Sequence, residues 1–137
     1  MEISNEELVE KAIEASENAY CPASNFRVGA ALLTVEGYIY LGCNIENGSY
    51  SLTNCAERTA FFKAISEGKK LFKAIAIVGS STISFNEFCY PCGACRQVMS
   101  EFCDGDFKII LGRIDDDNNI EVKEYTLSEL LPESFKF

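Results

Sequence analysis

An apolar stretch interrupted by a single turn occupies residues 26–43, FRVGAALLTVEGYIYLGC. Branched and aromatic side chains are frequent in it, which predicts two strands, at 26–35 and 38–43. Glu36-Gly37 separates the two apolar runs and is typical of a hairpin turn. The segment therefore predicts a pair of neighbouring strands around which a sheet can be built.

The remaining chain places helices and strands on both sides of this hairpin. Helical spacing of apolar residues and boundary residues predict helices at 5–18, 55–67, 91–102 and 127–131. Apolar runs predict further strands at 72–79, 107–112 and 120–125. Pro91 is expected at the first helical position, which needs no N–H donor. The order α-β-β-α-β-α-β-β-α predicts an α/β protein whose helices cover the faces of a sheet.

The composition predicts one domain over residues 1–137. Apolar residues make up 47% of the chain and charged residues 24%, as in ordinary globular domains. No apolar run approaches the roughly 20 residues of a membrane span, and the acidic start of the chain lacks the features of a signal peptide. We therefore expect no membrane partner and a cytoplasmic location, where thiols stay reduced. The net charge of −9 disfavours binding to nucleic acid.

Three of the seven cysteines form a pattern, Cys-Ala-Glu at 55–57 and Pro-Cys-Gly-Ala-Cys at 91–95. Three thiolates, from Cys55, Cys92 and Cys95, can hold one zinc ion and leave its fourth position open, as catalytic zinc sites do. The chain has no histidine, so proton transfer near pH 7 falls to another group, such as a carboxylate with a raised pKa. This favours Glu57, two residues after the first ligand, as the general acid and base.

The predicted ligands lie at the expected starts of two helices, where the helix dipole and free N–H groups stabilise thiolates. Zinc with three thiolates still carries a net negative charge, which disfavours the ionisation of a bound water. Arg58, three residues after Cys55, is expected to offset this charge, and Arg96, four residues after Cys92, is a second candidate. The alternative for both arginines is an ordinary place on a helix surface.

Two other interpretations of the cysteines stay open at this point. A Cys-x-x-Cys pair alone is also found in redox dithiols. A structural zinc site completed by Cys89 is the second alternative. Neither interpretation gives Glu57 a role. The remaining cysteines, Cys21, Cys43 and Cys103, are expected to pack as small apolar residues.

Five blocks of the chain, taken in order, resemble the cytidine deaminase family, in its small homotetrameric form with three cysteine ligands. They are FRVGAA (26–31), GCNIEN (42–47), CAERTA (55–60), PCGACRQV (91–98) and LLP (130–132) with Phe135. The resemblance implies a three-layer α-β-α fold with a five-stranded mixed sheet. It also implies one Zn2+ per subunit and a homotetramer whose active sites lie near the subunit interfaces.

The resemblance implies a reaction as well. Cytidine and 2′-deoxycytidine would be hydrolysed to uridine and 2′-deoxyuridine with release of ammonia, as part of pyrimidine salvage. Glu57 would carry the protons, and zinc would make hydroxide available near pH 7. The implied partner is a small neutral nucleoside, so the acidic surface is no obstacle to binding.

The same resemblance assigns residues to the substrate. Phe26 is implied to pack against the base or sugar, with a core strand aromatic as the plainer alternative. Asn44 and Glu46 are implied to hydrogen-bond the ribose hydroxyls. Ala56 is implied to offer backbone groups to the edge of the base, and Phe135 to reach the site of a neighbouring subunit.

The sequence departs from the family pattern at one position and leaves two alternative functions open. Tyr90 stands where the family commonly has a small hydroxyl residue. A related small deaminase acting on a cytosine-nucleoside antibiotic such as blasticidin S would share the zinc motifs, although Asn44 and Glu46 favour an ordinary ribose. A non-catalytic, zinc-stabilised binding module would keep the ligands and make no use of Glu57.

Overall fold

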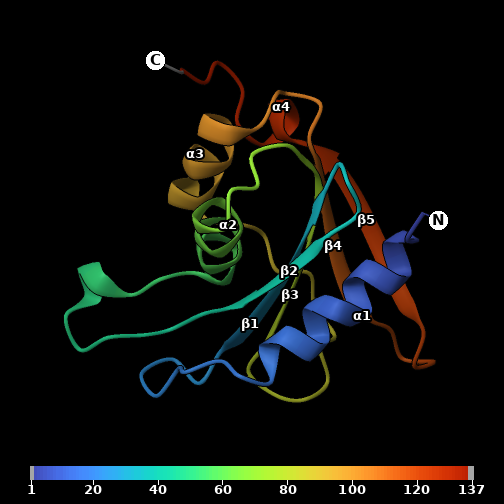
Figure 1. Ribbon diagram of the computed structural model, residues 1–137. Helices are drawn as coiled ribbons and strands as arrows, with labels where there is room; N and C mark the ends of the chain where they lie inside the picture. Colours follow the sequence, from blue (N-terminus) through green and yellow to red (C-terminus); the bar gives the residue numbers. More distant parts are fainter. Residues whose placement is uncertain (1, 136–137) are drawn as a thin grey trace.

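The computed structural model describes residues 2–135, in which helices and strands follow the predicted order (Figure 1). The helices are α1 (Asn5–Ser16), the 3-10 helix η1 (Tyr50–Leu52), α2 (Ala56–Ser66), α3 (Gly93–Phe102) and α4 (Leu127–Leu130). The strands are β1 (Arg27–Thr34), β2 (Ile39–Cys43), β3 (Phe72–Ser80), β4 (Lys108–Ile114) and β5 (Ile120–Thr126). In residues 2–135 no helix is long and apolar enough to cross a membrane.

The five strands form one mixed sheet in the order β2-β1-β3-β4-β5. Only β3 and β4 are parallel, and α3 lies in the connection between them. The other neighbours are antiparallel, including the predicted hairpin, in which Leu33 lies opposite Ile39. Gly37 closes the hairpin at a φ of +99°, a conformation that glycine adopts without steric penalty. The prediction of a mixed five-stranded sheet is confirmed.

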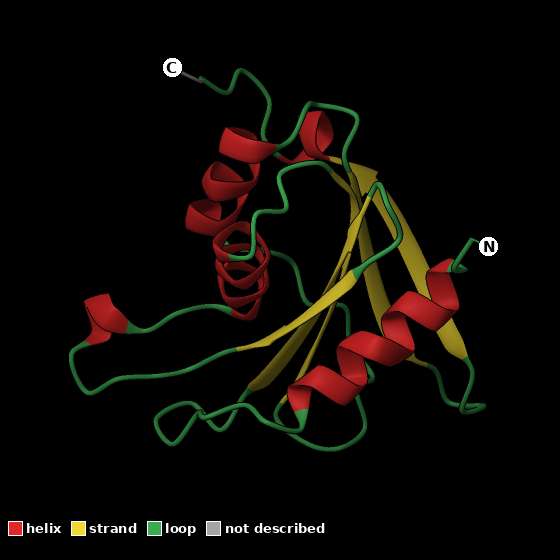
Figure 2. Ribbon diagram, in the orientation of Figure 1, coloured by secondary structure: helices red, strands yellow, loops and turns green. Residues whose placement is uncertain are grey.

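Helices cover both faces of the sheet and give it three layers (Figure 2). Side chains alternate along β1, so that Ala30 and Leu32 join the core under α2 and α3. Ala31 and Leu33 join a second core under α1. The strands β1, β3 and β4 are therefore buried on both faces, which explains their nearly continuous apolar sequences.

The third long helix begins later than predicted. Pro91 was expected at its first position, but the helix begins at Gly93 and Cys92 is its N-cap. Cys92 is extended, with φ −71° and ψ 166°, and its carbonyl accepts the N–H of Arg96 at 3.0 Å. The prediction for Pro91 was wrong because an extended Cys92 takes the capping position and separates the proline from the helix. The first helix also ends at Ser16, two residues before the predicted end.

Helix α2 approaches the sheet most closely at Gly42 of β2. A Cβ atom on Gly42 would lie 2.4 Å from the carbonyl oxygen of Ala56 and 2.6 Å from the backbone nitrogen of Ala60. Both atoms belong to the helix backbone, so a side chain at Gly42 could be accommodated only by moving α2. The glycine thus sets how deep the first turn of α2, which carries Glu57, sits against the sheet.

Gly42→Ala is expected to lower the free energy of unfolding by about 2 kcal/mol or more, because overpacking against a backbone displaces the whole helix. Urea unfolding followed by circular dichroism measures the change. Gly48→Ala is the matched control, since nothing lies within 4 Å of the position of its Cβ. Equal stabilities of the two variants would contradict the close packing of α2.

Candidate metal centre and substrate pocket

Two helix N-termini bring the predicted ligands together. Cys55 is the N-cap of α2, Cys92 is the N-cap of α3, and Cys95 lies in the first turn of α3. Neither N-cap cysteine uses its side chain to cap its helix, which leaves both sulfurs free for other contacts. Free N–H groups and the helix dipoles at the N-termini of α2 and α3 favour negative charge on these sulfurs.

The three sulfurs have the spacing that a zinc ion requires. The Sγ atoms of Cys55 and Cys92 are 3.7 Å apart, and those of Cys92 and Cys95 are 3.4 Å apart. All three lie within 4.8 Å of one another, and all three thiols are free. Tetrahedral zinc with Zn–S bonds of about 2.3 Å places its sulfurs about 3.8 Å apart. The donor set therefore fits zinc with three protein ligands and one open position.

Glu57 lies in the first turn of α2, immediately after the first ligand segment, and is only 4% exposed. Burial, with a smaller contribution from the nearby Cys55 thiolate, raises the pKa of its carboxyl group to about 7. A carboxyl group with a pKa near neutrality can both accept and donate a proton under physiological conditions. In a chain without histidine, this is the property that the sequence required of Glu57.

Arg58 contacts the metal centre directly. Its Nη2 donates a hydrogen bond to Cys55 Sγ at 3.2 Å. Hydrogen bonds from the Cys95 thiol and from Arg58 lower the pKa of the Cys55 thiol, so that its anionic form is favoured. The contact supports the prediction that Arg58 offsets thiolate charge.

Arg96 is placed differently. Its Nε donates to the carbonyl of Pro91 and its Nη1 to the carbonyl of Leu130, both at 2.8 Å. The side chain thereby ties the segment before α3 to the end of α4. These contacts support a bracing role, and the charge-balancing role expected for Arg96 stays a prediction.

Three residues predicted to bind substrate form one connected network. Asn44 Nδ2 donates to the carbonyl of Phe26 at 2.8 Å, and Asn44 Oδ1 accepts the N–H of Val28 at 2.9 Å. Glu46 accepts hydrogen bonds from the Ser24 hydroxyl and the Ser24 N–H. The hydroxyl of Ser24 in turn accepts the N–H of Phe26 at 3.0 Å. Ser24, which the sequence analysis did not single out, links the carboxylate of Glu46 to the backbone of Phe26.

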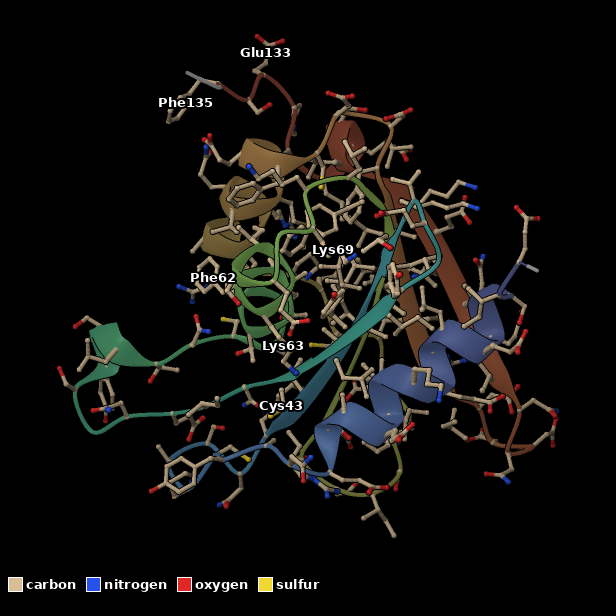
Figure 3. The ribbon with its side chains drawn as sticks, viewed as in Figure 1. Cys43, Phe62, Lys63, Lys69, Glu133 and Phe135 are labelled. Atoms are coloured by element: carbon tan, nitrogen blue, oxygen red, sulfur yellow. The ribbon has the colours of Figure 1, made fainter. Side chains whose placement is uncertain are left out.

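Ala56 and Phe135 lie in contrasting environments. Ala56 is fully buried at the first position of α2, between Cys55 and Glu57, and its contact with the edge of the base stays a prediction. Phe135 lies on the C-terminal tail, is 63% exposed, and sits at the periphery of the molecule (Figure 3). Its reach into the site of a neighbouring subunit stays a prediction.

The Tyr90 side chain contacts β5. Its hydroxyl lies 3.2 Å from the hydroxyl of Tyr125 and accepts a hydrogen bond from Lys123 at 3.3 Å. The departure from the family pattern at Tyr90 therefore builds a contact with the sheet edge. Lys123 also lies 4.7 Å from the ring centroid of Phe88, a cation–π contact that holds the same loop.

Cys89 does not belong to the ligand group. In residues 2–135 the cluster able to hold a metal comprises Cys55, Cys92 and Cys95 alone. Burial raises the pKa of the Cys89 thiol to about 12, so it is a neutral side chain at physiological pH. The four-thiolate structural site considered from the sequence is thus not supported by the structure.

A zinc centre with three protein ligands, beside a buried carboxyl group, defines a metal-dependent enzyme rather than a structural zinc domain. A family model for the cytidine and deoxycytidylate deaminase zinc-binding region matches residues 2–111. The chain therefore belongs to the cytidine and deoxycytidylate deaminase family.

Relatives and solved structures agree over most of the chain. The sequence is 50% identical over 130 residues to a cytidine deaminase of Sporosarcina psychrophila, covering 95% of this chain and 90% of the relative. It is 52% identical over 128 residues to a cytidine deaminase of Halalkalibacterium halodurans, covering 93% of this chain and 91% of the relative. The crystal structure of a cytidine deaminase from Burkholderia pseudomallei has a TM-score of 0.83 at 44% identity, covering 97% of this chain and 100% of that one. The resemblance inferred from the five motifs is confirmed.

Arg58→Gln is expected to lower zinc affinity about 10- to 100-fold, as for other groups that hydrogen-bond to metal ligands. The loss follows from leaving the Cys55 thiolate without its cationic partner. Competition with a chelator of known affinity measures it. Arg58→Lys keeps the positive charge with a different geometry, and its zinc affinity is expected to lie between those of the wild type and Arg58→Gln. If Arg58→Gln bound zinc and turned over substrate as the wild type does, the assignment would be wrong.

Proposed function

We propose that this chain hydrolyses cytidine and 2′-deoxycytidine to uridine and 2′-deoxyuridine, releasing ammonia. The observation that carries the proposal is the position of Glu57, a buried carboxyl group in the same helical turn as a zinc-ligand segment. Family membership supports the same reaction, since the relatives above are cytidine deaminases. Nothing among these relatives favours an antibiotic such as blasticidin S as the substrate.

Glu57 is the residue that moves protons in this reaction. When bound, zinc acts as a Lewis acid that makes a water nucleophilic near pH 7. Glu57 accepts a proton from the attacking water and donates it to N3 of the cytosine ring. It then transfers the second proton of that water to the 4-amino group, whose bond to C4 breaks as ammonia leaves. One carboxyl group serves for both transfers because each donation returns it to the ionised form.

The pocket residues divide between sugar and base. Phe26 packs against the nucleoside, and Ala56 presents backbone groups to the edge of the base. Asn44 and Glu46 bind the ribose hydroxyls. Supporting this, the network through Ser24 holds Glu46 and Phe26 in fixed relation. A nucleoside is neutral, so the acidic carboxylate of Glu46 does not repel it as it would repel a phosphate.

The assembly is proposed to be a homotetramer in the cytoplasm, serving pyrimidine salvage. The segment between β2 and α2 extends away from the body and carries η1 at its tip (Figure 1). Tyr50 and Leu52 on it are 81% and 66% exposed, and Phe135 on the C-terminal tail is also exposed. These apolar side chains support contacts with neighbouring copies. A zinc centre made of thiolates requires reduced cysteines, which supports a cytoplasmic location.

Sedimentation equilibrium of the purified protein is expected to give four times the mass of one chain. Exposed apolar side chains on the extended segment are the physical reason, because they would be covered in the assembly. A mass equal to one chain at micromolar concentration would rule out the tetramer and leave Phe135 without a role at the active site.

Glu57→Gln is expected to lower cytidine turnover about 1,000-fold or more, with zinc content unchanged, because the amide keeps the shape of the carboxylate but cannot carry protons. Loss of cytidine absorbance measures turnover, and metal analysis measures zinc. Glu67→Gln, at the far end of the same helix, is the matched control and is expected to remain within about twofold of wild type. A binding module with no catalytic role would instead show no turnover in any of the three proteins.

A further inference from the structure

Gly79 lies near the carboxyl end of β3, on the face of the sheet that carries α2 and α3. Its neighbour Val78 points into the opposite core, under α1, and side chains alternate along a strand. A Cβ atom on Gly79 would lie 2.8 Å from Phe26 Cε2, 2.8 Å from Cys89 Sγ and 3.0 Å from Cys89 Cβ. The Phe26 ring and the Cys89 side chain therefore occupy the space that a side chain at position 79 would need.

The backbone of Phe26 is fixed by hydrogen bonds, but its ring is not. Ser24 Oγ accepts the Phe26 N–H, and Asn44 Nδ2 donates to the Phe26 carbonyl. Phe26, just before β1, is 38% exposed, and its ring has no polar atom to anchor it. Its orientation must come from the groups around it, and both Phe26 Cε2 and Cys89 Sγ lie 2.8 Å from the position that a Cβ atom on Gly79 would occupy.

The loop that carries Cys89 is anchored independently of substrate. Phe85, four residues earlier, is 6% exposed and inserts into the core under α1. Its carbonyl accepts the N–H of Ile114 at 2.7 Å, which ties the loop to the end of β4. Cys89 then lies three residues before the ligand Cys92. A fixed loop can support the Phe26 ring in the same place before and after substrate arrives.

We propose that Gly79 and Cys89 form a seat for the Phe26 ring, so that Gly79 is a positioning residue that determines where the nucleoside lies in the pocket. The inference rests on the proposed function, because it takes Phe26 as a contact of the nucleoside. Cys89 contributes shape rather than reactivity: it is outside the ligand group of Cys55, Cys92 and Cys95.

The geometry distinguishes Gly79 from Gly29 and Gly42, two other tightly packed glycines. A side chain on Gly29 or Gly42 would meet helix backbone, which cannot give way without moving a helix. A methyl group on Gly79 would meet only side-chain atoms of Phe26 and Cys89. Gly79→Ala is therefore expected to fold, with the ring and the thiol pushed aside.

Gly79→Ala is expected to lower kcat/KM for cytidine about 10- to 100-fold, since displacement of a pocket wall by a fraction of an ångström to an ångström has effects of this size. The dissociation constant of uridine, measured by titration, should rise because the displaced ring changes binding as well as turnover. Zinc content should be unchanged, because none of the three ligands lies within the clash. Gly105→Ala, which meets only Ser128 at 3.2 Å or more, is the control for a glycine-to-alanine change elsewhere.

Two double variants test whether the effect passes through the proposed seat. Cys89→Ala removes the Sγ atom that a methyl on Gly79 would meet but leaves the contact with Phe26 Cε2, so adding it to Gly79→Ala should recover part of the loss in kcat/KM, measured against Cys89→Ala alone. In a Phe26→Leu background, which lacks the Cε2 atom, Gly79→Ala should lower kcat/KM by no more than about threefold. A role confined to general stability would show neither coupling.

The outcomes separate this inference from the proposed function. If the wild type converts cytidine and Gly79→Ala retains its kcat/KM and uridine affinity, the seat is refuted while the function stands. Effects of Gly79→Ala that simply multiply with those of Cys89→Ala and Phe26→Leu would also refute it. If the wild type, with zinc bound, does not convert cytidine, the proposed function fails, and uridine titration of the same variants still decides whether Gly79 positions Phe26.

Discussion

The structure depends on placing three thiolates close together while burying a carboxyl group beside them, away from water. The ends of two helices meet this requirement, because each offers unpaired N–H groups and a favourable dipole to the anionic sulfurs. Cys55 comes from α2, and Cys92 and Cys95 come from α3, so the centre joins elements far apart in sequence. Bound zinc would couple these two helices and add its binding free energy to the stability of the fold.

The sheet determines where the two helices can begin. Helix α3 lies between the parallel strands β3 and β4, so its N-terminus follows the carboxyl end of β3, where ligands bind in open α/β sheets. The close approach of α2 to Gly42 fixes the other half of the centre. Phe26 immediately precedes β1, the strand antiparallel to β3, whose first residue pairs with Ser80 at the carboxyl end of β3. The segments that carry the metal ligands and the residues proposed for catalysis and substrate binding thus converge because strand directions place them together.

Most of the fold and the central chemistry could be predicted from the sequence, because they depend on local patterns. Apolar runs predicted the strands, and the spacing of cysteines around one glutamate predicted the metal centre. What the sequence could not show depends on packing between distant segments. The direction of Arg96 is set by the carbonyls of Pro91 and Leu130, and the link through Ser24 exists only because its loop folds against Glu46. Likewise, the sequence does not reveal why position 79 lacks a side chain. The reason appears in the fold, where Phe26 and Cys89 occupy the space that a side chain there would need.

The central claim is that zinc at the three thiolates and the turnover of cytidine are one property of this chain. Zinc content and cytidine turnover should be measured on the same preparation while the metal is removed stepwise with a chelator and then returned. The account predicts one zinc per chain at full activity, turnover that falls in proportion to the zinc lost, and recovery when zinc is restored. Turnover that persists after the zinc is gone, or an intact zinc centre that does not convert cytidine, would contradict it.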